Sequence, residues 1–188
     1  MFSEGMLFLV NTLFDIYLFI LIVRVILGYV RSDYFNPITQ FVVRMTDFIV
    51  KPLRRIIPNF HGVELSSVLL IILLELIKFL LISALTFGLP NIGGLIILAF
   101  GDMLAMFIRV FIYAIILQAI ISWVQPQSPI NYTLYQFTSP IMRPFQRLIP
   151  PIGGFDISPI PAIIVLQLLI IILVNPIMEL GTRGAFLG

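Results

Sequence analysis

The sequence contains no cysteine and only one histidine. Without cysteine, the chain has no disulfide, iron–sulfur cluster, thiolate zinc site or cysteine nucleophile. One histidine also cannot supply a bis-histidine haem site within a single chain. There is no glycine-rich phosphate loop, Ser/His/Asp array or cluster of metal ligands. We therefore expect no catalytic residues, no metal and no cofactor, and a protein that is not an enzyme.

Charge is equally scarce. Only 11% of the 188 residues are charged and 60% are hydrophobic, whereas roughly 25% of residues are charged in an ordinary soluble domain. A soluble fold of this size cannot hide so much apolar surface, so the surrounding solvent must be lipid. The net charge of +2 is too small to indicate a nucleic-acid partner.

Four apolar stretches are long enough to cross the hydrocarbon core, which needs about 20 residues. The expected spans are about 6–29, 66–87, 103–124 and 160–179. The third apolar run begins near Ile92, and Gly94 and Gly101 interrupt it. We therefore predict a short interfacial piece at 92–100 and a span that begins near Asp102.

An internal repeat organises the chain. KPLRRIIP at 51–58 matches RPFQRLIP at 143–150, an offset of 92 residues. Upstream, an offset of 94 aligns Arg24 with Gln118. The offset of 92 also aligns Pro37 with Pro129, Thr46 with Thr138, Glu64 with Asp156, Ser66 with Ser158 and Glu75 with Gln167.

The repeat predicts an all-α membrane protein with four transmembrane helices in two tandem units. The first repeat covers 1–90 and the second covers 91–188, with connectors at 31–65 and 125–159. Each unit consists of a helix, an amphipathic interfacial connector and a second helix. Because each unit contains an even number of spans, the two units have parallel topology and both connectors lie on one side of the membrane.

The distribution of basic residues predicts which side that is. Outside the connectors and the spans, only Arg183 in the C-terminal tail is basic. Cytoplasmic loops carry the excess of lysine and arginine, so we expect cytoplasmic connectors and both termini on the opposite side. The basic residues of the connectors are Arg31, Arg44, Lys51, Arg54, Arg55, Arg143 and Arg147.

The connectors have the pattern of helices that lie flat in the membrane interface. Apolar and polar residues alternate at helical spacing over 37–51 and 129–139, and prolines are expected to end both helices soon afterwards. One interpretation is a membrane-surface linker whose basic residues meet anionic headgroups. The other is a platform that docks a protein partner. The candidate contact residues for either are Arg44, Lys51, Arg54, Arg55, Arg143 and Arg147.

Four charged residues lie deep within the predicted spans. Asp15 is about 20 Å from the cytoplasmic end of its helix, and Arg109 is its repeat equivalent. Glu75 and Lys78 lie about 13 and 18 Å deep and are close enough in sequence to meet on one helix face. We predict that Asp15 pairs with Arg109 between the repeats. The cluster is either a structural ion pair that fixes helix register or a relay for protons or ions.

Two further charges are expected to need no special role. Arg24, about one turn inside the boundary, is long enough to reach the headgroups. Asp102 is expected near the outer interface.

The loop before the last span reads Gly-Gly-Phe-Asp-Ile-Ser-Pro at 153–159. Asp156 or Ser158 can cap the following helix, and Pro159 suits its first turn. Gly153 and Gly154 permit a sharp turn. Helix capping alone explains the two polar residues, although a site in this loop is the alternative.

With this loop, the Ser-Trp-Val motif and the Arg-Pro-Phe-Gln-Arg-Leu-Ile-Pro motif, the chain resembles the YggT family of small bacterial and plastid membrane proteins. The resemblance implies a bacterial inner-membrane protein with no established enzymatic chemistry. With the connectors in the cytoplasm by the positive-inside rule, both termini are then expected in the periplasm. Relatives have been connected with cell-division gene neighbourhoods, with osmotic tolerance, and in plastids with assembly of a b-type cytochrome or with nucleoid organisation.

We therefore expect a non-enzymatic scaffold or assembly factor, linked to cell division, the envelope or osmotic stress. Its partners would be anionic lipid, an unidentified membrane or cytoplasmic protein, and further copies of the chain. The alternative is a small ion transporter or channel component that uses the charges within the spans.

Overall fold

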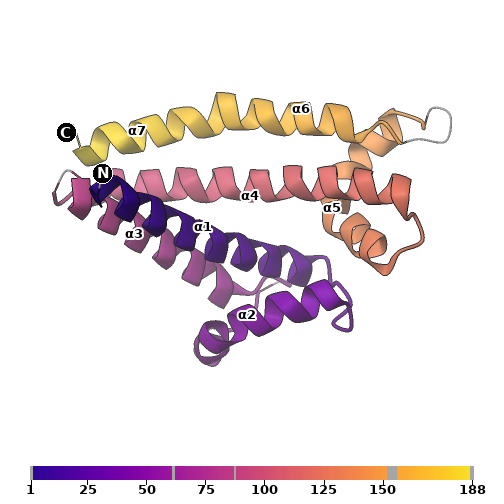
Figure 1. Ribbon diagram of the computed structural model, residues 1–188, viewed down its shortest axis with the longest axis horizontal. Coiled ribbons are helices and arrows are strands. Elements are labelled where there is room, and N and C mark those ends of the chain that lie inside the picture. The colour runs from indigo at the N-terminus through magenta and orange to yellow at the C-terminus, as the bar shows by residue number, and fades with distance from the viewer. Residues whose placement is uncertain (1, 61, 87, 152–155, 187–188) are drawn as a thin grey trace.

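The computed structural model describes residues 2–60, 62–86, 88–151 and 156–186, and every regular element in these ranges is a helix. Figure 1 shows an elongated arrangement in which the long helices run side by side. The helices are α1 (Phe2–Tyr29), α2 (Pro37–Arg54), α3 (Leu65–Thr86), α4 (Ile92–Val124), α5 (Pro129–Leu148), α6 (Pro159–Leu169), the π-helical turn η1 (Ile170–Val174) and α7 (Asn175–Phe186).

Among the described residues, four helical segments are long and apolar enough to cross a membrane: α1, α3, α4 and the continuous α6–η1–α7 segment. Helices α2 and α5 connect the first and second span of their respective repeats. Both chain termini lie at one end of the molecule, and the connector helices lie toward the other (Figure 1). This is the predicted all-α architecture of two tandem repeats in parallel topology.

Helix α4 is longer than predicted. It is a single helix of 33 residues, about 50 Å long, so the separate interfacial piece predicted at 92–100 is wrong. Its glycines allow close packing and do not interrupt it. A Cβ at Gly94 would lie 2.0 Å from the Ala185 backbone nitrogen, and one at Gly181 would lie 2.5 Å from the Leu98 nitrogen. Glycine at these points lets α4 and α7 approach backbone to backbone.

The last span contains a π-helical turn just before a proline. The Asn175 N–H donates to the Ile170 carbonyl, five residues earlier. Pro176 follows; it has no N–H, and its ring would clash with the carbonyl four residues earlier in a regular α-helix. The π turn is a known way to absorb such a disruption within a helix. The span therefore continues to Phe186.

The connector helices begin with matched signals and extend further than predicted. Asn36 and Ser128 occupy the N-cap positions, and each side chain accepts a hydrogen bond from a backbone N–H of its helix. A proline follows each cap, where no N–H is needed. The later prolines do not end the helices. Pro52, Pro140 and Pro144 lie inside them on exposed surface. The Gln136 carbonyl, which loses its N–H donor at Pro140, accepts a hydrogen bond from Ser139 Oγ instead.

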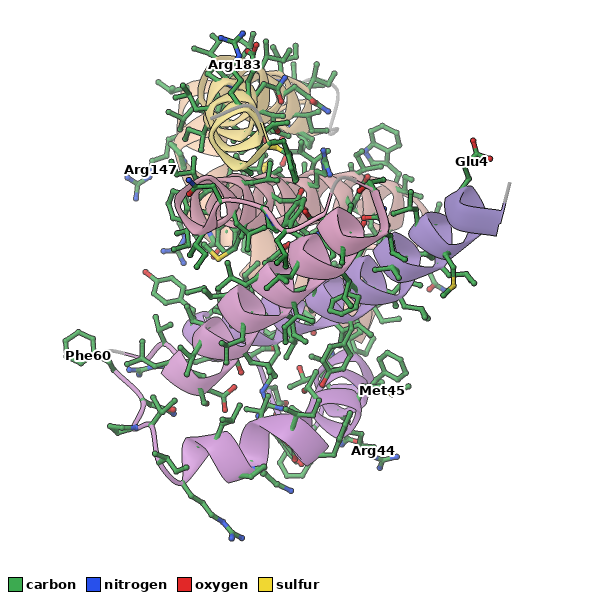
Figure 2. The ribbon with its side chains drawn as sticks, turned by 90° about the vertical axis from the view of Figure 1, so that its left-hand side faces the viewer. Glu4, Arg44, Met45, Phe60, Arg147 and Arg183 are labelled. Atoms are coloured by element: carbon green, nitrogen blue, oxygen red, sulfur yellow. The ribbon has the colours of Figure 1, made fainter. Side chains whose placement is uncertain are left out.

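Helix α2 presents three distinct faces. Its inner face packs against the spans and contains Thr39, Val42, Thr46 and Val50. A second face carries Phe41, Met45 and Phe48, which are large, apolar and exposed. The third is polar and carries Arg44, Lys51 and Arg54. Figure 2 shows Arg44 and Met45 both pointing outward from the helix. An exposed apolar face beside a basic face is typical of a helix in the membrane interface.

Candidate functional site

Arg24 is the centre of a buried ion-pair site in the first repeat. Only 8% of its surface is exposed. Its Nε lies 2.6 Å from Glu64 Oε2, and its Nη1 lies 2.8 Å from Asp47 Oδ1. The same Nη1 donates to Thr46 Oγ1 at 2.7 Å. One guanidinium therefore ties α1 to the connector helix α2 and to the residue just before α3. The prediction that Arg24 extends to the headgroups is wrong, because these three acceptors hold it inside the protein.

The electrostatics of this site stabilise the ionised carboxylates. Burial alone would raise the pKa of Glu64, but hydrogen bonds from Arg24 and Ser67 and the charge of Arg24 lower it below its ordinary value. Burial likewise opposes the ionisation of Asp47, whose pKa is nevertheless lowered by hydrogen bonds from Lys51 and Arg24. Both acids therefore stay charged at neutral pH.

The second repeat has polar residues at the equivalent positions, but they form hydrogen bonds and no ion pairs among the described residues. Gln118 replaces Arg24, and its Oε1 accepts a 2.5 Å hydrogen bond from Thr138 Oγ1. Asp156, the equivalent of Glu64, accepts a hydrogen bond from Gln146 Nε2 at 3.0 Å. Within the described residues, no lysine or arginine nitrogen lies within 4.0 Å of Asp156. The site therefore contains a carboxylate without a cation.

Asp156 also organises the start of α6. Its Oδ1 accepts from the Ser158 backbone N–H at 2.9 Å and from Ser158 Oγ at 2.5 Å. Ser158 is the N-cap residue, yet its side chain caps no backbone N–H. Pro159 occupies the first helical position, as predicted. Gly153 and Gly154, which belong to the same predicted loop, lie outside the described residues.

Each repeat has a polar cavity at this position. The cavity of the first repeat is about 300 Å³ and is lined by Arg24, Thr39, Arg54 and Glu64, among others. The cavity of the second repeat is about 440 Å³. Its lining includes the four repeat equivalents of those residues, which are Gln118, Asn131, Gln146 and Asp156. The two cavities are therefore copies of one site that have diverged in charge.

The two connectors touch each other. Asn36 Nδ2, at the start of α2, donates a 2.5 Å hydrogen bond to Thr133 Oγ1 of α5. Both residues are buried. This contact joins the connectors of the two repeats at one end of the molecule.

The predicted contact residues of the connectors are all exposed. Lys51 Nζ lies 2.9 Å from Asp47 Oδ2, and Arg54 Nη1 lies 3.8 Å from Glu64 Oε1. Arg147 points away from the helices in Figure 2. The remaining predicted contact residues, which form no ion pair with the described residues, are Arg44, Arg55, Arg143 and Arg147.

The charges within the spans form a different cluster from the one predicted. Lys78 Nζ lies 3.0 Å from Asp15 Oδ1 and 2.8 Å from Glu75 Oε2. It also lies 2.5 Å from Asp102 Oδ2. The predicted meeting of Glu75 and Lys78 is confirmed. The predicted pairing of Asp15 with Arg109 is wrong, because Arg109 is exposed on α4 and pairs with no acid in the described part of the chain.

Asp102 was missed because the start of α4 was misplaced. Lys78 lies eight residues before the end of α3, and Asp102 lies ten residues after the start of α4. Counted from the linker between these helices, both lie at similar depth, about 12 and 15 Å. A helix correctly begun at Ile92 would have revealed this match.

This cluster contains more acidic than basic groups. Three carboxylates surround one ammonium, and Glu75 and Lys78 are fully or almost fully buried. Neither oxygen of Glu75 accepts a hydrogen bond of ordinary geometry from the described residues. Such an arrangement can lock three helices in register, and it can also hold a proton. Among the described residues, no group of histidine and acidic side chains has an arrangement that could hold a metal ion.

The fold and these sites define a four-span membrane protein of two tandem repeats, with a connector helix and a polar cavity in each. The chain belongs to the CCB3/YggT family, whose model matches residues 3–85 and again 97–177. The two matches correspond to the two repeats.

Several relatives share most of their length with the chain. An uncharacterized protein of Pseudomonas aeruginosa is 39% identical over 180 residues, covering 92% of this chain and 90% of the relative. The uncharacterized protein YggT of Escherichia coli K12 is 37% identical over 165 residues, covering 86% and 85%. An uncharacterized protein of Vibrio alginolyticus is 36% identical over 167 residues, covering 87% and 90%. No solved structure gives a significant match.

Proposed function

We propose that this protein is a non-enzymatic membrane scaffold or assembly factor whose two connectors form one basic docking platform for a membrane-bound or cytoplasmic protein. The observation that carries the proposal is the buried hydrogen bond between Asn36 and Thr133. It joins the two connectors, and the Arg24 ion pairs fasten the first connector to the spans. Flexible linkers would need neither contact.

The charge and shape of the platform suit a membrane surface. Its exposed basic residues would face the cytoplasm by the positive-inside rule, where each adds about 1 kcal/mol of attraction to an anionic leaflet. The exposed Phe41, Met45 and Phe48 provide an apolar face for the acyl boundary. The resemblance to the YggT family adds the expectation of a role in cell division, the envelope or osmotic stress.

Crosslinking tests the docking role. A photo-crosslinking residue at Arg55 and at its repeat equivalent Arg147 would lie on the exposed platform. The same residue at Leu89, which is 91% exposed between the repeats, is the matched control at the opposite end. We expect one specific protein adduct from Arg55 and Arg147 that is absent from Leu89. Equal capture at all three positions, or none from the platform, would contradict the proposal.

The orientation of the platform can be measured separately, because the chain has no native cysteine. Single cysteines at 55 and 89 can be labelled with a membrane-impermeant maleimide that has access to the periplasm. We expect Leu89→Cys to react in intact cells and Arg55→Cys to react only after lysis. The reverse pattern would show that the connectors face the periplasm.

Ion transport is a second candidate, supported by the excess carboxylates around Lys78. The neighbouring cavity between α1, α3 and α4 is about 250 Å³ and is lined by apolar side chains, including Ile22, Ile71 and Phe107. None of the four charged residues lines this cavity, and Glu75 and Lys78 are fully or almost fully buried, which favours a dry, structural cluster. Purified protein in liposomes is therefore expected to leave K⁺, Na⁺ and H⁺ gradients intact. Gradient dissipation that Lys78→Ala abolishes would favour transport over the scaffold.

A further inference from the structure

The cavity of the second repeat contains a carboxylate that lacks the cation present in the first repeat. In the first repeat, the Arg24 guanidinium contacts Glu64 directly. In the second, Gln118 is neutral and Asp156 keeps only neutral hydrogen-bond donors among the described residues. The two repeats thus contain the same site with and without a cation beside the carboxylate.

Asp156 is positioned to accept a further donor. Its carboxylate receives three hydrogen bonds, from Gln146 Nε2, the Ser158 N–H and Ser158 Oγ. A carboxylate has about four acceptor sites, so one remains available while the other three fix its orientation. Asp156 itself lines the cavity. The charge that is absent from the second repeat can therefore be supplied by a ligand.

The cavity has the size and lining of a small-molecule site. Its volume of about 440 Å³ lies within the usual range of roughly 300–1,000 Å³ for ligand pockets. Tyr132 and Tyr135 form part of the wall, and aromatic faces attract ammonium groups. Ser128 at the N-terminus of α5 also lines it. Because Pro129 has no N–H and the Asn131 N–H already donates to Ser128 Oγ, the donor available to a phosphate here is the Ser128 hydroxyl.

We propose that the second-repeat cavity binds the ethanolamine headgroup of a phospholipid, with its primary ammonium on Asp156 and its phosphate toward the start of α5. The cavity lies between the end of the third span and an interfacial helix, which is the depth of lipid headgroups. Gln118 and Gln146 supply amide oxygens for the remaining ammonium hydrogens. This site does not depend on the proposed docking role of the connectors.

Lipid retention tests the site. Purified protein is exchanged into detergent with equimolar phosphatidylethanolamine, phosphatidylcholine and phosphatidylglycerol, and the retained lipids are counted by native mass spectrometry. We expect one phosphatidylethanolamine to be retained at least tenfold more than phosphatidylcholine, whose quaternary ammonium has no hydrogen to donate. Equal retention of the three lipids would overturn the proposal.

Two variants connect this lipid to the cavity. Asp156→Asn removes the negative charge that would bind the ammonium. Gln118→Arg supplies the guanidinium that Arg24 provides in the first repeat. Both variants are expected to abolish the preference for phosphatidylethanolamine. Gln118→Arg keeps the test valid if Asp156→Asn does not fold, because an arginine here gains a partner. Asp33→Asn changes an exposed carboxylate outside both cavities and is expected to keep the preference.

Two results would count against the site. Unchanged retention in folded Gln118→Arg protein would overturn it. Displacement of the lipid by equimolar soluble phosphoethanolamine would overturn the assignment to a membrane lipid.

Discussion

Replacing Arg24 by glutamine, its equivalent in the second repeat, tests whether the buried Arg24 ion pairs hold the first connector against the spans. The change leaves Asp47 and Glu64 without their shared guanidinium, although their side chains are only 20% and 12% exposed. Removing one partner of a buried ion pair costs about 3–5 kcal/mol. Lys51 still pairs with Asp47, and Arg54 lies 3.8 Å from Glu64. We therefore expect the lower end of this range, about 3 kcal/mol of unfolding free energy.

The assay is equilibrium unfolding by sodium dodecyl sulfate in mixed micelles. Lys51→Gln is the matched control, because Lys51 also pairs with Asp47 but is 72% exposed; we expect it to cost less than about 1 kcal/mol. The double variant Arg24→Gln/Glu64→Gln removes one of the two stranded carboxylates and should recover part of the loss. An unfolding free energy of Arg24→Gln within about 0.5 kcal/mol of wild type would refute this account, since that is the scale of an ordinary surface change.

Three further predictions concern the same structure. The pKa values of Glu64 and Asp47 are lowered in the folded protein, so these acids contribute their full stability above their ordinary pKa values of 4.5 and 3.8. That contribution is lost as the pH falls below those values. The unfolding midpoint of the wild type should therefore fall on acidification, and the midpoint of Arg24→Gln should fall less. Gly94→Ala pushes α4 away from α7 and should lower the unfolding free energy by about 1–3 kcal/mol. Gly28→Ala is the control, because a Cβ there meets nothing within 4 Å, and it should be neutral or stabilising in the same titration. Lys78→Met strands three carboxylates and should lower the unfolding free energy by about 3–5 kcal/mol; a value equal to wild type would show that the cluster is not an ion pair.

The parts of the fold that depend on local pattern could be predicted from the sequence. Hydropathy identified the four spans, and the offsets of 92 and 94 residues aligned the connectors and the residues that line the two cavities. The contact between Glu75 and Lys78 followed from their spacing on one helix. Each of these inferences needs only residues on one element, or the comparison of one repeat with the other.

Contacts between elements were harder to predict, because helical rise gives the depth of a residue but not the direction it faces. Asp15 and Arg109 lie at the same depth by repeat symmetry, yet the cation that pairs with Asp15 is Lys78 of α3. Arg24 bonds to Asp47 and Glu64, which lie 23 and 40 residues away, and no periodic pattern connects them. Repeat alignment marked Glu64 and Asp156 as equivalent but did not show what either binds.

The glycines of α4 illustrate a second reason. The sequence pattern predicts interruptions at Gly94 and Gly101, since glycine weakens an isolated helix. In a membrane, the same residue allows two helices to pack closely, and Gly94 contacts the backbone of α7. The sequence alone does not separate these two uses, because the difference lies in the partner helix.

The most direct test of the central claim, that both connectors meet at one end of the molecule, is crosslinking of Asn36→Cys with Thr133→Cys. The chain has no other cysteine and both positions are buried, so a disulfide formed by mild oxidation, which needs no room for a linker, reports on this pair alone in native membranes. We expect an efficient crosslink within one chain, seen as a faster-migrating monomer, and no such product from the control pair Leu89→Cys with Thr133→Cys. Absence of the crosslink from the first pair, or its formation only between two chains, would contradict the account.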